Sequence, residues 1–311
     1  MTKIYNFDNL ISSGVGYGGH GGSKKGIVFE NERWFLKYPK STKSMRDVAI
    51  SYTTTPISEY IGSHIYLSVG IDTHKTKIGI ANGKVVVACK DFLTPEEAIF
   101  DYNSIKNEYD EKTENILESI SSSTLDNTSN NLEEIMVVME NNPYFKKVPE
   151  LKDRFWDMFI IDALINNNDR NEGNWGLIVN RQTGNLKIAP VYDNGAAFYN
   201  KADDKKIENI LNNPTKLKQS AYDSDISIFK YNGRKINPLK FIESKINNDC
   251  NKAIIRIVPK INLEQIKNII NEIPETYGEY KIISKEQKEL YYKVLELRYE
   301  SVLLLIYNEL K

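Results

Sequence analysis

Cysteine is scarce in this sequence. Its two cysteines, Cys89 and Cys250, are far apart and show no CxxC spacing. This scarcity argues against a structural zinc site and against a framework of disulfides. A reducing compartment is therefore the expected environment of the chain.

Positive charge is not in excess. The sequence has 41 Lys and Arg against 42 Asp and Glu, which gives a formal net charge of -1 and a pI near 6.4. Proteins whose main ligand is the phosphate backbone of DNA or RNA usually carry a basic field, and none is visible here. We expect no nucleic-acid partner.

Long hydrophobic runs are also missing. The apolar stretch Val302 to Tyr307 is far shorter than the roughly 20 residues that span a bilayer. The N-terminal segment MTKIYNFDNL has one lysine and no continuous apolar core, so it does not resemble a secretory signal peptide. We expect no membrane insertion and a location in the cytoplasm.

Glycine, by contrast, is concentrated near the N-terminus. The stretch GVGYGGHGGSKKG, residues 14–26, cannot form a regular helix and predicts a loop with unusual backbone freedom. After it, GIVFENERWFLKYPK alternates apolar and polar residues around a turn at Asn31 to Glu32. This alternation predicts a β-hairpin that Pro39 ends.

A helix and two further strands are expected before residue 93. Pro56 opens the segment ISEYIGSHIYLSVG, whose isoleucines repeat at helical spacing and whose final glycine marks a helix end. The runs HKTKIGIA and KVVVACKDFL are separated by the turn dipeptide Asn82-Gly83, which predicts that they pair as strands.

The character of the sequence changes at Thr94. The segment Thr94-Pro95-Glu96-Glu97 resembles a capping box and predicts the start of a helix-rich half. We therefore predict an α+β fold with two parts, an N-lobe of antiparallel sheet with one helix over residues 1–93 and a mainly helical C-lobe over residues 94–311. The polar segment from Ser119 to Asn131 is expected to be a surface loop.

Short polar side chains gather in LINNNDRNEGNWGLIVN, residues 164–180, between an expected helix and an expected strand. Asp169 and Asn174 are five residues apart, and Asp193 follows nineteen residues later in IAPVYDNGAAF. If the flanking strands pair through Asn180 to Asn185, the three side chains converge. Two carboxylates and a carboxamide form a set of hard oxygen ligands that suits Mg²⁺.

A magnesium ion held in this way usually keeps contacts with substrate phosphates, so a phosphate-binding element is expected near it. The glycine cluster offers exposed backbone N–H groups, and Lys25 and Lys37 are candidate cationic contacts. This combination indicates phosphoryl transfer with ATP and Mg²⁺ as cofactors.

The spacing of Asp169 and Asn174, followed by Asp193-Asn194-Gly195, matches the catalytic and metal-binding loops of protein kinases. Arg170 follows the aspartate, whereas the usual order in protein kinases places Arg before Asp. The strings DRNEGNWGL and PVYDNGAAF together resemble the HipA-like serine/threonine kinases. The order Asp-Arg is also similar to that of phosphatidylinositol kinases.

The resemblance implies a two-lobed, protein-kinase-like fold with ATP between the lobes. It implies that Asp169 accepts or orients the attacking hydroxyl and that Asn174 and Asp193 hold Mg²⁺. In the N-lobe, GGSKKGIVF is similar to the glycine-rich loop of the family, and WFLKYP to the strand that carries its nucleotide-binding lysine. The implied cofactor-binding residues are Gly21, Gly22, Ser23, Lys25, Lys37 and Glu59, the last as the partner of Lys37.

The expected function is therefore an ATP- and Mg²⁺-dependent serine/threonine protein kinase with a protein acceptor. Autophosphorylation is expected at Ser12, Ser13 or Ser23, which lie in or beside the glycine cluster. The alternatives are a phosphoinositide or small-molecule kinase and a catalytically silent pseudokinase that serves as an interaction module. The pseudokinase predicts loss of a metal ligand, and none is lost here.

The resemblance also bears on location and partners. The chain lacks the extra N-terminal subdomain of HipA, so association with an antitoxin and DNA is not implied. Its length and compact N-terminal half are similar to a bacterial branch of the family whose members enter other cells. This similarity implies a bacterial cytoplasmic protein that can be delivered outside the cell.

Overall fold

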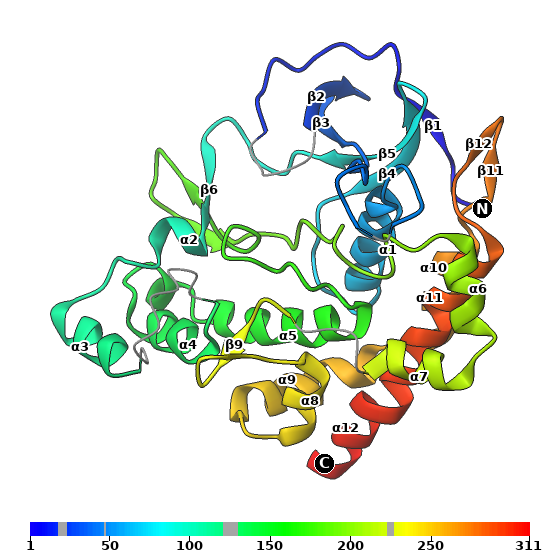
Figure 1. Cartoon of the computed structure of the whole chain (residues 1–311). Helices are drawn as coiled ribbons and strands as arrows, with labels where there is room; N and C mark the ends of the chain where they lie inside the picture. The colour runs from blue at the N-terminus through cyan, green and yellow to red at the C-terminus, as the bar shows by residue number, and fades with distance from the viewer. Residues whose placement is uncertain (18–23, 47, 121–129, 223–226) are drawn as a thin grey trace.

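The computed structural model describes residues 1–17, 24–46, 48–120, 130–222 and 227–311. The predicted site residues Gly21, Gly22 and Ser23 lie outside these ranges, as does most of the predicted loop from Ser119 to Asn131. Within the described residues, a curled sheet is followed by a mainly helical region (Figure 1). The predicted α+β fold is confirmed.

A five-stranded sheet occupies the N-terminal region, with its strands in the spatial order β1-β4-β5-β3-β2. The strands are β1 (Tyr5–Asn6), β2 (Lys24–Phe29), β3 (Glu32–Lys37), β4 (Thr76–Ala81) and β5 (Lys84–Lys90). The hairpin predicted for β2 and β3 is confirmed, and Ile27 lies opposite Trp34. Glu30 and Asn31 have positive φ, so the turn begins one residue earlier than predicted.

The two faces of this sheet differ. One face carries a small apolar cluster that includes Ile27, Trp34, Leu36 and Val86, each at most 2% exposed. Because successive side chains of a strand point to opposite faces, Lys37 lies on the other face. That second face is turned toward helix α1 (Thr55–Ser68) and the C-terminal region (Figure 1).

Helix α1 connects the sheet to the rest of the molecule. Pro56 stands in its first turn and Gly70, with a φ of 79°, follows its end, as predicted. Ile57, Ile61 and Ile65 are buried in the same apolar core as the C-terminal helices. Residues on α1 are thereby fixed relative to both the sheet and the helical region.

The helix predicted to begin at Thr94 is wrong. Residues Glu97–Asp101 form strand β6, which pairs antiparallel with β7 (Gly176–Asn180). The local contact that suggested a helix does form, since the Glu97 carboxylate accepts a hydrogen bond from the Thr94 N–H at 3.0 Å. The ladder with β7, which is distant in sequence, overrides this local signal.

Strand β8 (Leu186–Ile188) pairs with β7 through the turn at Asn180 to Asn185, which confirms the predicted hairpin. Helix α5 (Glu150–Ile165) runs through the centre of the helical region (Figure 1). The remaining elements are α2 (Tyr102–Ile105), α3 (Glu111–Ile120), α4 (Leu132–Asn141), η1 (Phe145–Lys147), α6 (Asp204–Leu211), α7 (Pro214–Tyr222), β9 (Lys230–Tyr231), β10 (Arg234–Lys235), α8 (Pro238–Ser244), α9 (Asn248–Ile257), η2 (Val258–Lys260), α10 (Leu263–Asn271), β11 (Thr276–Tyr277), β12 (Tyr280–Lys281), α11 (Lys285–Arg298), η3 (Tyr299–Leu303) and α12 (Leu304–Leu310).

The last three of these elements form one C-terminal helix with a π-helical turn at Tyr299–Leu303. Across the parts of the chain that the structure describes, no helix is both long and apolar enough to cross a membrane.

Candidate active site

Three side chains from separate elements meet at the second face of the sheet. The ammonium of Lys37, on β3, lies 2.7 Å from Glu59 Oε2 on α1 and 2.9 Å from Asp193 Oδ1. Glu59 is buried, while the Asp193 side chain is 38% exposed. The structure thus brings together the lysine, the helix glutamate and the second aspartate that the sequence had placed in one site.

Lys37 and each of the two carboxylates shift one another's pKa toward the charged form. Burial opposes the charge on Lys37, but the carboxylates of Asp193 and Glu59 outweigh it and raise the pKa of Lys37. Lys37 in turn lowers the pKa of Asp193, and burial of Glu59 is outweighed by Lys37 and His74, so the pKa of Glu59 is also lowered. All three groups are charged at neutral pH. The carboxylate of Asp193 is the more exposed of the two, so it is the one that a bound cation can reach.

Lys25 does not reach this cluster. The β-ladder places Lys25 opposite Leu36, and Lys25 is exposed. Lys24 lies directly opposite Lys37, so these two side chains project from the same face. Burial and the charge of Lys37 lower the pKa of Lys24, whereas the charge of Asp193 acts in the opposite sense. The strand register therefore places Lys24, and not the predicted Lys25, on the face that carries Lys37.

The loop that carries Asp169 begins where α5 ends. Asn166 closes the helix in the left-handed conformation, with a φ of 58°, and Asp169 is exposed. The Nδ2 of Asn174 donates to the backbone oxygen of Asp169 at 3.0 Å. This bond fixes the loop and leaves Oδ1 of Asn174 as the atom of that side chain suited to bind a cation.

Arg170 holds the loop that carries Asp169 from its buried side. It is fully buried and forms a bidentate pair with Asp162 on α5, with Nε to Oδ2 at 2.8 Å and Nη2 to Oδ1 at 3.0 Å. Its Nη1 also donates to the backbone oxygen of Asn174 at 3.2 Å and to that of Tyr192. One guanidinium therefore ties α5, the loop that carries Asp169 and the residue before Asp193 together.

Asn194 extends this network to helix α1. Its Oδ1 accepts from Arg170 Nη2 at 2.7 Å, and its Nδ2 donates to Ser63 Oγ at 3.0 Å. Its backbone N–H donates to Glu59 Oε1 at 3.1 Å. The close approach depends on Gly62, where an added Cβ would lie 3.0 Å from the Asn194 Cβ.

His74 is the remaining polar group around Glu59. Its Nε2 lies 2.8 Å from Glu59 Oε1, and His74 is 2% exposed. Glu59, His74 and Cys89 place possible metal ligands within 4.8 Å of one another. However, Lys37 and the Asn194 N–H already occupy the Glu59 oxygens, and burial raises the pKa of the Cys89 thiol. His74 therefore holds Glu59 in place, and the three side chains are a poor metal site.

Sequence reasoning missed Asp162, Arg170, Asn194 and His74 as parts of the site. Arg170 and Asn194 belong to the two motifs DRNEGNWGL and PVYDNGAAF, but the sequence did not indicate what their side chains bind. Asp162 lies one helical turn and a loop before Asp169, on the buried side of α5, and His74 precedes β4. Only the folded chain reveals that these residues share hydrogen bonds.

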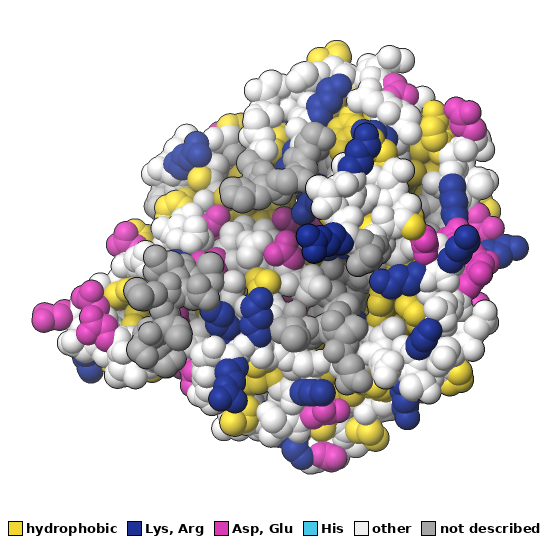
Figure 2. Space-filling model, in the orientation of Figure 1, with side chains coloured by type: hydrophobic (Ala, Val, Ile, Leu, Met, Phe, Trp, Pro, Cys, Tyr) yellow, Lys and Arg dark blue, Asp and Glu magenta, His cyan; other side chains and the backbone are white. Residues whose placement is uncertain are grey.

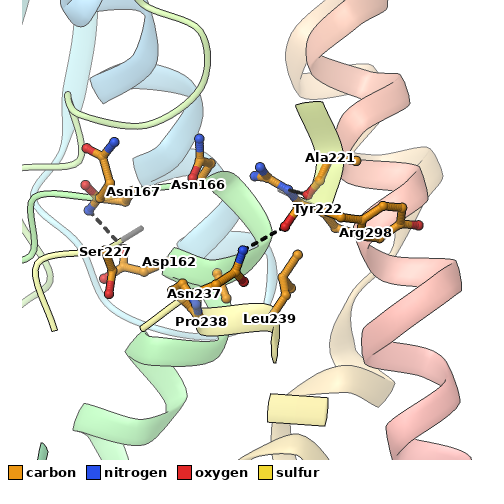
Figure 3. Close-up of a pocket in the computed structure, with 12 residues that line it drawn as sticks. Asp162, Asn166, Asn167, Ala221, Tyr222, Ser227, Asn237, Pro238, Leu239 and Arg298 are labelled. Atoms are coloured by element: carbon orange, nitrogen blue, oxygen red, sulfur yellow. Dashed lines mark hydrogen bonds between the residues drawn. The ribbon is translucent and has the colours of Figure 1, made fainter. Parts of the chain in front are cut away.

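A small pocket lies behind the loop that follows α5, and its lining includes the end of α5, Tyr222, Asn237 and Arg298 (Figure 3). Asn237 Nδ2 donates to the Tyr222 oxygen at 2.7 Å, and Arg298 Nε donates to the Ala221 oxygen at 2.9 Å. Asn167 Nδ2 donates to Asp162 Oδ1 at 3.0 Å. The lining residues are thus joined by hydrogen bonds to one another, and these bonds hold the wall of the pocket together.

Surface charge is mixed on the face of the molecule that Figure 2 shows. In Figure 2, Lys and Arg side chains are interspersed with Asp and Glu over this face. The mixture agrees with the net charge of -1. Among the described residues in this view, the side chains do not gather into a patch of one sign of the kind that binds polyanions.

Comparison with known proteins identifies the family. The serine/threonine-protein kinase CtkA of Helicobacter pylori strain J99 is 33% identical over 294 residues, which covers 94% of this chain and 84% of that protein. The chain belongs to the CtkA family of serine/threonine kinases. Its fold matches the crystal structure of the H. pylori proinflammatory kinase CtkA with a TM-score of 0.85 and 31% identity, over 99% of this chain and 98% of that one.

The predicted kinase-like fold and the serine/threonine kinase family are thereby confirmed. No protein-family model matches the chain. A HipA chain from Shewanella oneidensis aligns over 96% of this chain and 70% of its own length, with a TM-score of 0.49 and 10% identity. That level of similarity does not by itself establish a shared fold.

Proposed function

We propose that the protein transfers the γ-phosphoryl group of ATP, with Mg²⁺, to serine or threonine hydroxyls of a protein. The observation that carries the proposal is the Lys37 ammonium held between Glu59 and Asp193. Such a lysine–glutamate pair, next to a metal-binding aspartate, is the arrangement that active protein kinases require. The nucleotide would lie between the N-lobe, residues 1–93, and the C-lobe, residues 94–311.

The phosphates of ATP would meet two cations on one sheet face. Lys37 is oriented by Glu59, which the Asn194 N–H and His74 hold in turn. Lys24 projects beside Lys37 from the neighbouring strand. Gly21, Gly22 and Ser23 directly precede Lys24 in sequence, and we propose that their backbone N–H groups complete the phosphate site.

The metal would be held by Asn174 and Asp193. A carboxamide oxygen and a carboxylate are hard oxygen ligands that fit Mg²⁺. When bound, the ion would neutralise the charge on the phosphates and orient them. Asp193 has a φ of 61°, an unusual conformation for a residue other than glycine, and this conformation directs its side chain toward Lys37.

Asp169 would accept or orient the acceptor hydroxyl. Its side chain is exposed on a loop whose backbone is held by bonds from Asn174 and Arg170. An exposed carboxylate on a fixed loop can approach a hydroxyl that arrives from solvent without a change in the loop. This geometry suits a macromolecular acceptor.

A phosphoinositide kinase is the alternative that the order Asp169-Arg170 supports. Its test is transfer from radiolabelled ATP, in Mg²⁺, to a generic basic protein compared with transfer to phosphoinositide vesicles. We expect phosphoserine or phosphothreonine in the protein and little labelled lipid. Labelled lipid without phosphoserine or phosphothreonine would reject the protein acceptor. No transfer to either acceptor would favour the pseudokinase.

Removal of the proposed metal ligand should weaken nucleotide binding only when metal is present. We expect Asp193→Ala to raise the Kd for ATP in Mg²⁺ at least about tenfold, because a carboxylate ligand of the ion is lost. In EDTA the variant should bind ATP at least as tightly as the wild type, because one negative charge beside Lys37 is removed. Calorimetric titrations in both buffers measure this, and equal Kd values in Mg²⁺ would contradict the assignment.

We also expect the protein to phosphorylate itself near the glycine cluster. Residues Ile11 to Ser13 lie along the edge of β2, where the Ser13 N–H donates to the Gly26 oxygen at 3.1 Å. A phosphate on Ser12, Ser13 or Ser23 would repel the phosphates of ATP and lower activity. Mass spectrometry after incubation with Mg-ATP, with the Asp169→Ala variant as control, should find phosphate between residues 12 and 23. Its absence in the active wild type would exclude this mode of regulation.

A further inference from the structure

Tyr17 lies against the sheet face that carries Lys37. Its ring stacks on that of Phe35, with centroids 4.5 Å apart and an angle of 27° between the planes. Phe35 is two residues before Lys37 on β3, so both side chains point to the same face. Tyr17 therefore occupies the nucleotide side of the sheet, and part of it remains exposed.

Gly26 provides the room for this ring. Gly26 lies directly opposite Phe35 in the β2–β3 ladder, so a side chain there would project from the same face as Phe35. An added Cβ would lie 3.0 Å from Tyr17 Cε2 and 2.3 Å from Ser13 Oγ. Because Gly26 has no side chain, Ser13 and Tyr17 can pack against this face of the sheet.

The hydroxyl of Tyr17 is anchored at the connection between the two lobes. It donates to Asp91 Oδ2 at 2.9 Å, directly after β5 ends at Lys90. Arg33 lies 3.6 Å from the same carboxylate and donates to the Leu93 oxygen at 2.7 Å. Burial and Asp91 raise the pKa of Tyr17, so its hydroxyl remains a donor at neutral pH. The Tyr17 side chain is thus held by Phe35 at one face of its ring and by Asp91 at its hydroxyl.

The Tyr17 ring lies on the path that a nucleotide bound at Lys37 is expected to take. With the phosphates at Lys37, the rest of the nucleotide extends along the same face toward the connection at Asp91. Phe35 is two residues along this path, about 7 Å from Lys37 in a β-strand. A planar base carried beyond the ribose would reach the Tyr17 ring rather than the sheet itself.

We propose that Tyr17 forms the stacking surface for the purine base of the nucleotide, with Phe35 and Asp91 holding its ring in place. The inference rests on the proposed function, because it takes the phosphate end at Lys37 as given. Stacking on an aromatic ring depends on the base and not on the phosphates. Purines, with the larger ring system, should gain more from it than pyrimidines.

The test compares nucleotides with a ligand that has no base. Calorimetry in Mg²⁺ would give Kd values of wild type, Tyr17→Ala and Tyr17→Phe for ATP, CTP and inorganic tripolyphosphate. We expect Tyr17→Ala to weaken ATP binding roughly tenfold, CTP binding less, and tripolyphosphate binding not at all. Tyr17→Phe keeps the ring and should stay within about threefold of wild type for ATP. Tyr277→Ala, at an exposed tyrosine on β11, is the matched control.

Two results would overturn the inference. If Tyr17→Ala binds ATP as tightly as wild type, the ring does not contact the base. If Tyr17→Ala binds ATP more tightly, Tyr17 occupies the place of the base and must leave when the nucleotide enters. Both results leave the kinase assignment in place when wild-type protein binds Mg-ATP and phosphorylates a protein. Failure of wild type to bind ATP would instead remove the proposed function itself.

Discussion

Replacement of Asp169 by alanine should abolish phosphoryl transfer while ATP binding in Mg²⁺ stays measurable. The loss should be at least about 100-fold in kcat, the usual contribution of a positioned general base. Nucleotide binding should persist because the proposed contacts to phosphate and metal come from Lys37 and Asp193. The loop should also persist, since Asn174 binds the backbone oxygen of Asp169 and not its side chain.

The measurement is the rate of label transfer to protein at saturating ATP, together with the Kd for ATP. Asp72→Ala is a matched control, because Asp72 is an exposed aspartate and its hydrogen bond to the Val191 N–H, at 2.8 Å, is made by its backbone oxygen. Near wild-type turnover of the Asp169→Ala variant would remove Asp169 from the reaction. Loss of both turnover and ATP binding would show instead that the loop depends on the Asp169 side chain.

Replacement of Arg170 by methionine should destabilise the whole protein by about 3–5 kcal/mol, the usual cost of breaking a buried ion pair from one side. Asp162 is 4% exposed and would be left without its bidentate partner, while Asn194 would lose the donor to its Oδ1. Because Arg170 also holds the backbone at Asn174 and Tyr192, the remaining folded protein should have a lower kcat.

Urea denaturation followed by circular dichroism would measure the free energy of unfolding. The double variant Asp162→Leu with Arg170→Met should be less destabilised than the sum of the single variants, because no unpaired charge remains. Arg234→Met, at an exposed arginine on β10, should change stability by no more than about 0.5 kcal/mol. An unfolding free energy of Arg170→Met close to wild type would contradict the structural role of the pair.

Much of the fold could be predicted because its signals are local. The hairpin of β2 and β3, helix α1 and the hairpin of β7 and β8 each depend on residues close in sequence. Strand β6 could not be predicted from its neighbours, since its hydrogen-bond partners lie on β7. A local contact between Thr94 and Glu97 satisfied the helix signal without a helix.

The sequence by itself determined the chemistry of this protein: the types and spacing of Asp169, Asn174 and Asp193, and the presence of Lys37 and Glu59 in a sheet and a helix. Spacing along the chain is sufficient there because each motif lies within one loop, strand or helix. Tertiary structure decided which side chains share the site. Cross-strand register selected Lys24 over Lys25, because adjacent residues of a strand face opposite sides. Arg170 is buried by residues that are distant in sequence, and a buried guanidinium needs hydrogen-bond acceptors. The fold supplies them from Asp162 and Asn194, which makes Arg170 the centre of the network.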